Sequence, residues 1–156
     1  MNTYKEHEFV DLGLPSGTLW ATCNVGADTP EGFGDYCSWD EGKTAAANWG
    51  EGWYMPTKEQ WEELGQHTES TWETRNGVNG RLFVANNGNA IFLPAAGYRD
   101  GEWIVDENSY GDYWSGSPNI DHPGNTWYFD FSQNYYDLND YHDCSIYSVR
   151  AVRSVR

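Results

Sequence analysis

Apolar and polar residues alternate over short stretches of this chain, and such alternation predicts strands more often than helices. Residues 7–12 and 18–22 are two β-prone runs separated by a Leu-Pro-Ser-Gly turn at residues 14–17, so we expect them to form a strand pair. Residues 149–152 contribute three apolar side chains and predict a last short strand.

The clearest strand pattern lies in the second half of the chain. Trp127, Phe129 and Phe131 alternate there with Tyr128 and Asp130. Because successive side chains of a strand point to opposite faces, the alternation predicts a buried aromatic face and an outward face that carries Tyr128 and Asp130. If the next stretch is also extended, Tyr135, Asp137 and Asn139 share one face, opposite Tyr136 and Leu138.

Helical signals are confined to two short stretches, of which the stronger begins at Thr57. Thr57 and Gln60 have the spacing of a capping box, and the Trp61 and Leu64 side chains that follow share one helix face. We therefore expect a helix that ends at Gly65.

The weaker helical signal lies at residues 28–33. Asp28 or Thr29 is a candidate N-cap, Pro30 suits the first helical position, and Glu31 suits the first turn. These features predict a short helix that ends at the glycines around Phe33.

Asparagine and glycine punctuate the middle of the chain with turn signals. They occur at residues 76–77, 79–80 and 86–88, and they separate strand-like runs at residues 81–85 and 89–94. Together with the two helices, this pattern predicts the α+β class, with two short helices and a twisted antiparallel sheet that carries long loops.

Composition and charge fit one loop-rich domain over residues 1–156. Aromatic residues make up 17% of the chain, so large rings are expected to form much of the core. Nine Lys and Arg oppose 24 Asp and Glu, and the resulting formal net charge of -15 argues against nucleic acid and anionic membranes as partners. No stretch resembles a membrane span or a signal peptide, so we expect a soluble monomer.

Three cysteines, Cys23, Cys37 and Cys144, make an odd number. A disulfide framework is therefore not expected. We predict three free thiols, with a single Cys23–Cys37 bridge as the alternative.

The composition changes at residues 119–148, which we call the variable segment. Nineteen of its thirty residues are Asn, Asp, Tyr, His or Ser, and it contains no Lys, Arg, Glu or Met. Its acids are five Asp and no Glu, whereas residues 1–118 hold twelve Glu and seven Asp. Acidity alone does not explain this bias.

Adenine-directed mutagenesis of AAC codons would explain it, because that process yields Asn, Asp, Tyr, His and Ser but not Lys, Glu, Gln, Met or Trp. Those last five types number 27 among residues 1–118, yet only Trp127 and Gln133 represent them in the variable segment. The alternative is that turn-rich loops favour Asn, Asp and Ser. Turn preference does not account for five tyrosines or for the missing Glu and Lys.

Six blocks of the sequence resemble one known family. The blocks are EFVDLGLPSGTLWATCNVGADTPEGFGDYCSW, WYMPTKEQWEEL, NGVNGRLF, NAIFLPAAGYRDG, GDYWSGS and SVRAV. Over nearly the whole chain they resemble the Fibrobacter succinogenes major paralogous domain family. The resemblance implies a C-type-lectin-like fold of the formylglycine-generating-enzyme type, the scaffold shared by variable proteins of diversity-generating retroelements.

In those proteins the variable segment lies near the C-terminus, as residues 119–148 do here. Many relatives are exported. The resemblance therefore implies a bacterial or phage receptor, which would lie at the cell surface or on the phage particle if an export signal or carrier was removed before Met1.

Metal-binding signals are weak. Asp137, Asp140 and Asp143 could contribute to a Ca²⁺ site, but the sugar-binding triplets of C-type lectins (Glu-Pro-Asn, Gln-Pro-Asp and Trp-Asn-Asp) are absent. His122 and His142 lack an evident third ligand for zinc. We expect no metal and no cofactor.

Catalytic signals are weak as well. No motif places two carboxylates across a cleft for glycoside hydrolysis, and the cysteines are not arranged as the reactive pair that the formylglycine-generating relatives use. No enzymatic activity is expected. Arg150 follows an acidic half of the chain, and we expect it to pair with a carboxylate inside the fold rather than to bind an anion.

The sequence thus predicts a non-enzymatic binding module in which the variable segment recognises a protein or glycan ligand. Tyr offers rigid contact area, and Asn, Ser and Asp adapt their hydrogen bonds. The expected binding residues are Asn119, Ile120, Asp121, His122, Tyr128, Asp130, Tyr135, Asp137, Asn139, Asp140, Tyr141, His142, Asp143 and Tyr147. The alternative is a surface lectin or adhesin of fixed specificity on the same fold.

Overall fold

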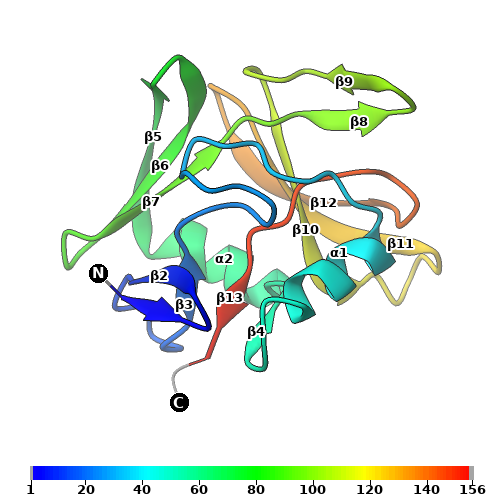
Figure 1. Ribbon diagram of the computed structural model, residues 1–156. Coiled ribbons are helices and arrows are strands. Elements are labelled where there is room, and N and C mark those ends of the chain that lie inside the picture. The colour runs from blue at the N-terminus through cyan, green and yellow to red at the C-terminus, as the bar shows by residue number, and fades with distance from the viewer. Residues whose placement is uncertain (1, 155–156) are drawn as a thin grey trace.

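The computed structural model describes residues 2–154 and has an α+β fold, in which two short helices lie among antiparallel sheets (Figure 1). The helices are α1 (Trp39–Ala47) and α2 (Lys58–Gln66). The strands are β1 (Thr3–Tyr4), β2 (His7–Asp11), β3 (Leu19–Ala21), β4 (Trp53–Tyr54), β5 (Thr68–Arg75), β6 (Val78–Ala85), β7 (Ala90–Pro94), β8 (Tyr98–Asp100), β9 (Trp103–Val105), β10 (Gly111–Pro118), β11 (Asn125–Phe131), β12 (Tyr136–His142) and β13 (Val152–Arg153). None of the helices within the described residues is long and apolar enough to cross a membrane.

Within residues 2–154 the strands form four sheets. Their orders are β1-β2-β3-β13-β4, β5-β6-β7, β10-β11-β12 and β8-β9, and neighbouring strands are antiparallel throughout. The predicted strand pair is confirmed as β2 and β3. The predicted last strand is shorter than expected, because β13 begins at Val152 and lies between β3 and β4.

Helix α2 begins as its capping signal predicts. The Thr57 hydroxyl accepts a hydrogen bond from the Gln60 backbone N–H at 3.1 Å, and the Gln60 side chain accepts one from the Thr57 N–H at 2.8 Å. Trp61 and Leu64 are fully buried, and the Trp61 ring stacks on Phe129 with 4.6 Å between ring centroids. The helix ends one residue beyond Gly65.

The helix expected after Asp28 or Thr29 does not form, and that prediction is wrong. The chain turns back on itself there, with the Asp35 N–H donating to the Val25 carbonyl at 2.9 Å. Gly34 permits this close approach, because a Cβ at its position would lie 2.4 Å from the Val25 carbonyl oxygen.

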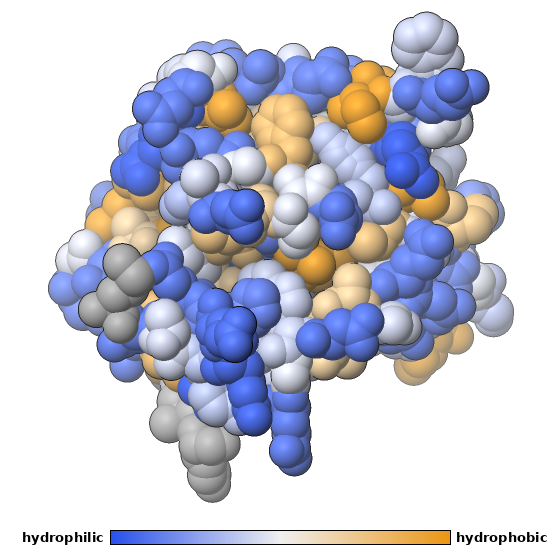
Figure 2. Space-filling model, in the orientation of Figure 1, coloured by the Kyte–Doolittle hydropathy of each residue, from blue (hydrophilic) through white to orange (hydrophobic). Residues whose placement is uncertain are grey.

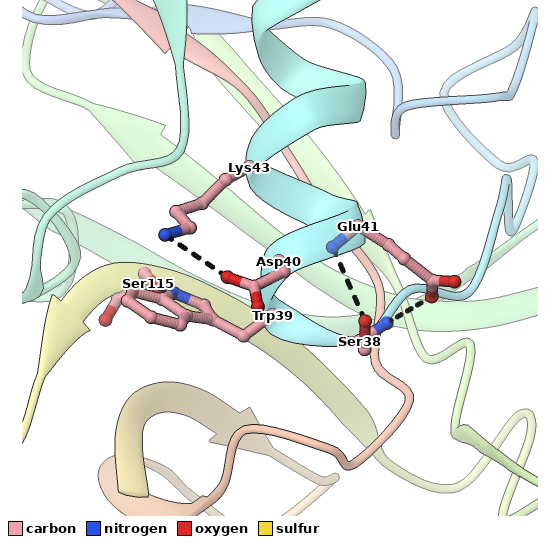
Figure 3. Close-up of polar contacts among 6 residues, drawn as sticks. All are labelled: Ser38, Trp39, Asp40, Glu41, Lys43 and Ser115. Atoms are coloured by element: carbon pink, nitrogen blue, oxygen red, sulfur yellow. Dashed lines mark hydrogen bonds and ion pairs between the residues drawn. The ribbon is translucent and has the colours of Figure 1, made fainter. Parts of the chain in front are cut away.

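The first helix instead begins after Ser38, where a second capping box forms (Figure 3). The Ser38 hydroxyl accepts from the Glu41 N–H at 3.4 Å, and the Glu41 carboxylate accepts from the Ser38 N–H at 2.9 Å. Asp40 and Lys43 form an exposed ion pair on the first turns, with 3.4 Å between Nζ and Oδ1. Sequence reasoning missed this helix because Gly42 interrupts it.

The turn at residues 76–77 is confirmed, because both residues have positive φ and join β5 to β6. Residues 86–88 also form a turn, as predicted. The turn expected at residues 79–80 is wrong, since both residues lie within β6. Gly80 is needed there for close strand pairing, because a Cβ would lie 2.3 Å from the Leu93 carbonyl oxygen of β7.

Two aromatic clusters lie on opposite faces of the β10-β11-β12 sheet. On the α2 face, Phe129 and Phe131 are 1% and 0% exposed, which confirms the predicted aromatic face for these two. Trp127 is only half-buried, with the Lys58 ammonium 4.2 Å from its ring centroid. On the other face, Trp114 is buried in the cluster that packs around α1.

Arg150 corrects another expectation. It is fully buried, but its guanidinium donates to neutral oxygens and not to a carboxylate. The acceptors are Asn24 Oδ1 at 2.8 Å and the carbonyl oxygens of Ala21 at 3.1 Å and Phe92 at 2.8 Å. Burial lowers the pKa of Arg150 from its usual value. Because delocalised charge is weakly hydrated, Arg tolerates such a site better than Lys would.

The surface agrees with the high net charge. Figure 2 shows hydrophilic residues over most of the face drawn in Figure 1, with hydrophobic residues in separate patches. The β8-β9 hairpin projects at the upper right of Figure 1 and carries Trp103, which is 76% exposed.

Candidate ligand-binding site

A cavity of about 790 Å³ lies between the β8-β9 hairpin, the β10-β11-β12 sheet and residues 144–147. Its volume falls within the range of small-ligand sites. We call it the tyrosine cavity, because six tyrosines line it: Tyr98, Tyr110, Tyr128, Tyr135, Tyr141 and Tyr147.

Strand register places the inner side chains of the cavity. Asp112 of β10 is directly opposite Asp130 of β11, and Tyr128 lies two residues before Asp130 on the same face. On the other side of β11, Thr126 pairs with Tyr141 of β12, which puts Tyr141 on this face as well. The sheet thus presents alternate residues of three strands to one space.

A carboxyl pair forms the floor of the cavity. Asp112 and Asp130 are directly opposite each other on β10 and β11, and both line the cavity. Burial and the neighbouring Asp130 raise the pKa of Asp112 to about 8, and burial also raises the pKa of Asp130. Asp112 is 8% exposed, and a pKa of about 8 favours its protonated form at neutral pH.

Asp130 accepts a further hydrogen bond from the rim. The Tyr135 hydroxyl donates to Asp130 Oδ2 at 2.8 Å, and the Asn139 amide lies 3.5 Å from the same oxygen. These donors favour the ionised form of Asp130, because a hydrogen bond to a carboxylate stabilises its charge. The pair therefore carries about one negative charge at neutral pH.

Aromatic contacts order the inner wall. The Tyr147 ring lies 4.7 Å from Tyr128, 6.3 Å from Tyr98 and 4.6 Å from Trp114, measured between ring centroids. Burial raises the pKa of Tyr128 to about 12 and also raises that of Tyr147, so both phenols stay neutral. The outer tyrosines are more accessible, with Tyr141 51% exposed.

Six of the fourteen predicted binding residues line the tyrosine cavity. They are Tyr128, Asp130, Tyr135, Tyr141, His142 and Tyr147. Three of these are less exposed than predicted. Tyr147 is only 6% exposed and Tyr128 is half-buried, because both rings pack on Trp114. Asp130 is also half-buried, rather than pointing into open solvent.

Four predicted residues lie in the loop between β10 and β11, outside the cavity. Ile120 is 88% exposed, and Asp121 and His122 are also exposed. Asn119 is 8% exposed, which contradicts its predicted place on the surface. Its side chain accepts from the Asp121 N–H at 3.0 Å, and its own N–H donates to the Asn125 carbonyl at 2.9 Å, so it holds the loop together.

Four more predicted residues lie on or after β12 without lining the cavity. Asp137 is exposed, and Asn139 is half-buried beside Asp130. Asp140 accepts from the Asn125 amide at 3.0 Å. Asp143 is half-buried, and its N–H donates to the Gly124 carbonyl at 3.0 Å.

Tyr136 and Leu138 lie on the opposite face of β12, as the alternation predicts, and this face turns toward α2. The Tyr136 hydroxyl donates to the Gly65 carbonyl at 3.0 Å, and Leu138 packs against the core around Trp61. A second, smaller cavity of about 370 Å³ lies on this side, between α2 and the β11-β12 pair. Trp127 and Lys58 line it.

Sequence reasoning missed the half of the cavity that lies outside the variable segment. Tyr98, Asp100, Asp106, Tyr110 and Asp112 line it, and all come from residues 98–112. This stretch is rich in Tyr and Asp, and the Asp-Gly pair at residues 100–101 is a hairpin signal. The composition and the hairpin signal together could have identified residues 98–112 as part of the site.

Among residues 2–154, no group of three or more His, Cys, Asp or Glu side chains is arranged to hold a metal ion. All three cysteines are free thiols. Burial raises the pKa of Cys23, and it raises the pKa of Cys37 to about 11. Cys144 is exposed and lines the tyrosine cavity.

No protein-family model, curated protein or solved structure matches the chain. Its function is therefore inferred from the residues and geometry of the cavity.

Proposed function

We propose that this chain is a non-enzymatic ligand-binding protein whose recognition site is the tyrosine cavity, carried on a C-type-lectin-like scaffold. The observation that supports this proposal is that much of the cavity wall comes from the variable segment. Nine cavity residues come from the variable segment, and seven of them are Tyr, Asp, His or Ser, types that AAC-codon mutagenesis yields. In this proposal the chain is the variable protein of a diversity-generating retroelement.

The chemistry of the wall suits recognition. Tyrosine has few rotatable bonds, so it gives contact area at a low entropic cost, and its hydroxyl can donate or accept a hydrogen bond. Tyr135 and Tyr141 reach the rim, whereas Tyr128 and Tyr147 pack against the fold and are fixed before a ligand arrives. A rigid inner wall with adaptable rim residues supports binding without a large ordering cost.

Sequences of sibling genes test the proposal. We expect substitutions at the cavity positions Tyr128, Asp130, Tyr135, Tyr141 and His142, whose side chains face the ligand space. A reverse transcriptase gene and a template repeat beside the gene are expected as well.

Buried positions of the same segment provide the internal control. Thr126, Phe129 and Phe131 are 0–1% exposed and should stay constant, and Asn119 should stay constant because it holds its loop. A constant variable segment would instead favour a lectin or adhesin of fixed specificity. Substitutions spread evenly over residues 1–156 would reject a diversified site.

A further inference from the structure

The carboxyl pair at the floor of the tyrosine cavity has no cationic partner in the protein. Both ion pairs found among residues 2–154 lie elsewhere, at Asp40–Lys43 and Glu73–Arg75. Arg99 is the one Lys or Arg side chain of the cavity lining, and it is exposed on β8. The floor therefore holds negative charge that no neighbouring side chain neutralises.

The groups that face the pair are acidic or neutral. Asp112 is faced by Asp130 of β11 and by Asp106, which follows β9. Asp130 is faced by Asp137 of β12 and by the Tyr135 hydroxyl. The remaining titratable groups of the lining are Tyr98, Arg99, Asp100, Tyr110, Tyr128, Tyr141, His142, Cys144 and Tyr147.

The wall above the pair is aromatic. The face of an aromatic ring carries partial negative charge and attracts a cation, most strongly where water is excluded. The Tyr147 ring lies between Tyr98 and Tyr128 there, 6.3 Å and 4.7 Å away between ring centroids, so aromatic rings form this part of the cavity lining. Rings and carboxylates together provide the two kinds of group that stabilise a large, weakly hydrated cation.

We propose that the tyrosine cavity binds an organic cation, a quaternary ammonium or guanidinium group, with the Asp112 and Asp130 carboxyl pair as its counter-charge. This inference deepens the proposed function and rests on it, because it names the ligand class of the same site. A metal ion fits this cavity less well. Ca²⁺ needs six to eight oxygen ligands close around it, whereas the two carboxyl groups border a space of about 790 Å³.

Binding of a cation is coupled to the shared proton. A positive charge beside the pair favours its fully ionised form, so the proton on Asp112 leaves when the ligand binds. Since the pKa of Asp112 is raised to about 8 in the free protein, affinity should increase with pH up to that value. Between pH 7 and pH 9 the expected increase is about tenfold for one released proton.

Two matched pairs of probes test the charge requirement on the full chain by titration calorimetry. Choline is compared with its neutral isostere 3,3-dimethylbutan-1-ol, and N-acetylarginine amide with N-acetylcitrulline amide. Both cations keep their charge from pH 7 to pH 9, so the protein alone supplies any pH dependence. At least one cation should bind about tenfold more tightly than its isostere.

Variants locate the binding charge. Asp130→Asn should weaken cation binding about tenfold, and Asp112→Asn should also remove its dependence on pH. Asp121→Asn changes the net charge equally on an exposed loop and should leave binding unchanged. Circular dichroism checks folding, and if Asp112→Asn does not fold, Asp130→Asn still decides whether the pair is used.

Two results would overturn the inference: equal affinity of each cation and its isostere, or no saturable binding of either cation. Tight binding of the neutral probes alone would indicate a polar, uncharged ligand class. None of these results would reject the proposed function if sibling genes still vary around the cavity, so the two failures are distinguishable.

Discussion

Asp112 is an acidic residue that the fold holds away from water. Its pKa in the folded protein is about 8, whereas the ordinary value of an aspartate is 3.8. A raised pKa means that the folded state binds a proton that the unfolded chain releases. The protonated Asp112 therefore makes its full contribution to the free energy of unfolding below pH 3.8. This contribution is lost as the pH rises to about 8.

We expect Asp112→Asn to remove this dependence. Between pH 5 and pH 7 the free energy of unfolding of the wild type should fall, relative to the variant, by about 1.4 kcal/mol per pH unit. Urea unfolding of both proteins at pH 5, 6 and 7 measures the difference, and the histidines cancel because both proteins carry them. Parallel curves would show that Asp112 is not protonated in the folded state.

Arg150 is the second residue whose burial has a measurable cost. Arg150→Met should lower the free energy of unfolding by about 3–5 kcal/mol, because the oxygens of Asn24, Ala21 and Phe92 lose their donors. Urea unfolding at constant pH measures it. Arg75→Met is the matched control on an exposed strand and should cost about 0.5 kcal/mol or less. Equal costs would contradict the structural role of Arg150.

At the scale of elements, strands β11 and β12 carry buried side chains beside exposed ones. Phe129→Ala should cost about 3–5 kcal/mol, because it opens a void beside the Trp61 ring. Tyr141→Ala, on the neighbouring strand but 51% exposed, should cost about 0.5 kcal/mol or less. Thermal melts of both variants decide the matter. A large loss for Tyr141→Ala would mean that the cavity wall supports the fold and is not free to vary.

Elements with a local signal were predictable, and those fixed by distant contacts were not. The capping box of Thr57 marked α2, and the alternation around Phe129 marked β11. The same capping signal at Ser38 was obscured because Gly42 lowers helix propensity. Strand β10 was missed because five consecutive residues, from Gly111 onward, are buried, so no alternation survives.

At the scale of the whole molecule, the cavity exists only because residues 98–112 meet residues 128–147. The hairpin joins the C-terminal part through the Arg99–Ile146 bridge, and it joins β10 through the Gly97–Gly111 bridge. The composition of the variable segment predicted that its residues would form part of the candidate site. No local pattern specifies that Asp112 lies opposite Asp130, because that pairing depends on strand register.

The thiols give a test on the intact protein. The mass of the unfolded chain should be the same before and after reduction, and a mass two units lower before reduction would show a Cys23–Cys37 bridge. Mild alkylation of the folded protein should modify Cys144 first, because it is exposed, whereas burial raises the pKa of Cys37 to about 11. Faster labelling of Cys37 would contradict the buried core around α1.

Strand β13 lies inside its sheet although it is the last strand in the sequence. This order delays the folding of the sheet while the chain is being synthesised on the ribosome. Strands β3 and β4 both pair with β13, so β4 has no strand partner, and β3 has one only in β2, until residue 153 has emerged. Until then their unpaired edges are open to chaperones and to other nascent chains. Tyr147 also emerges only shortly before that point. The cavity is therefore completed at almost the same moment as the sheet, and a stalled, shorter chain would lack both.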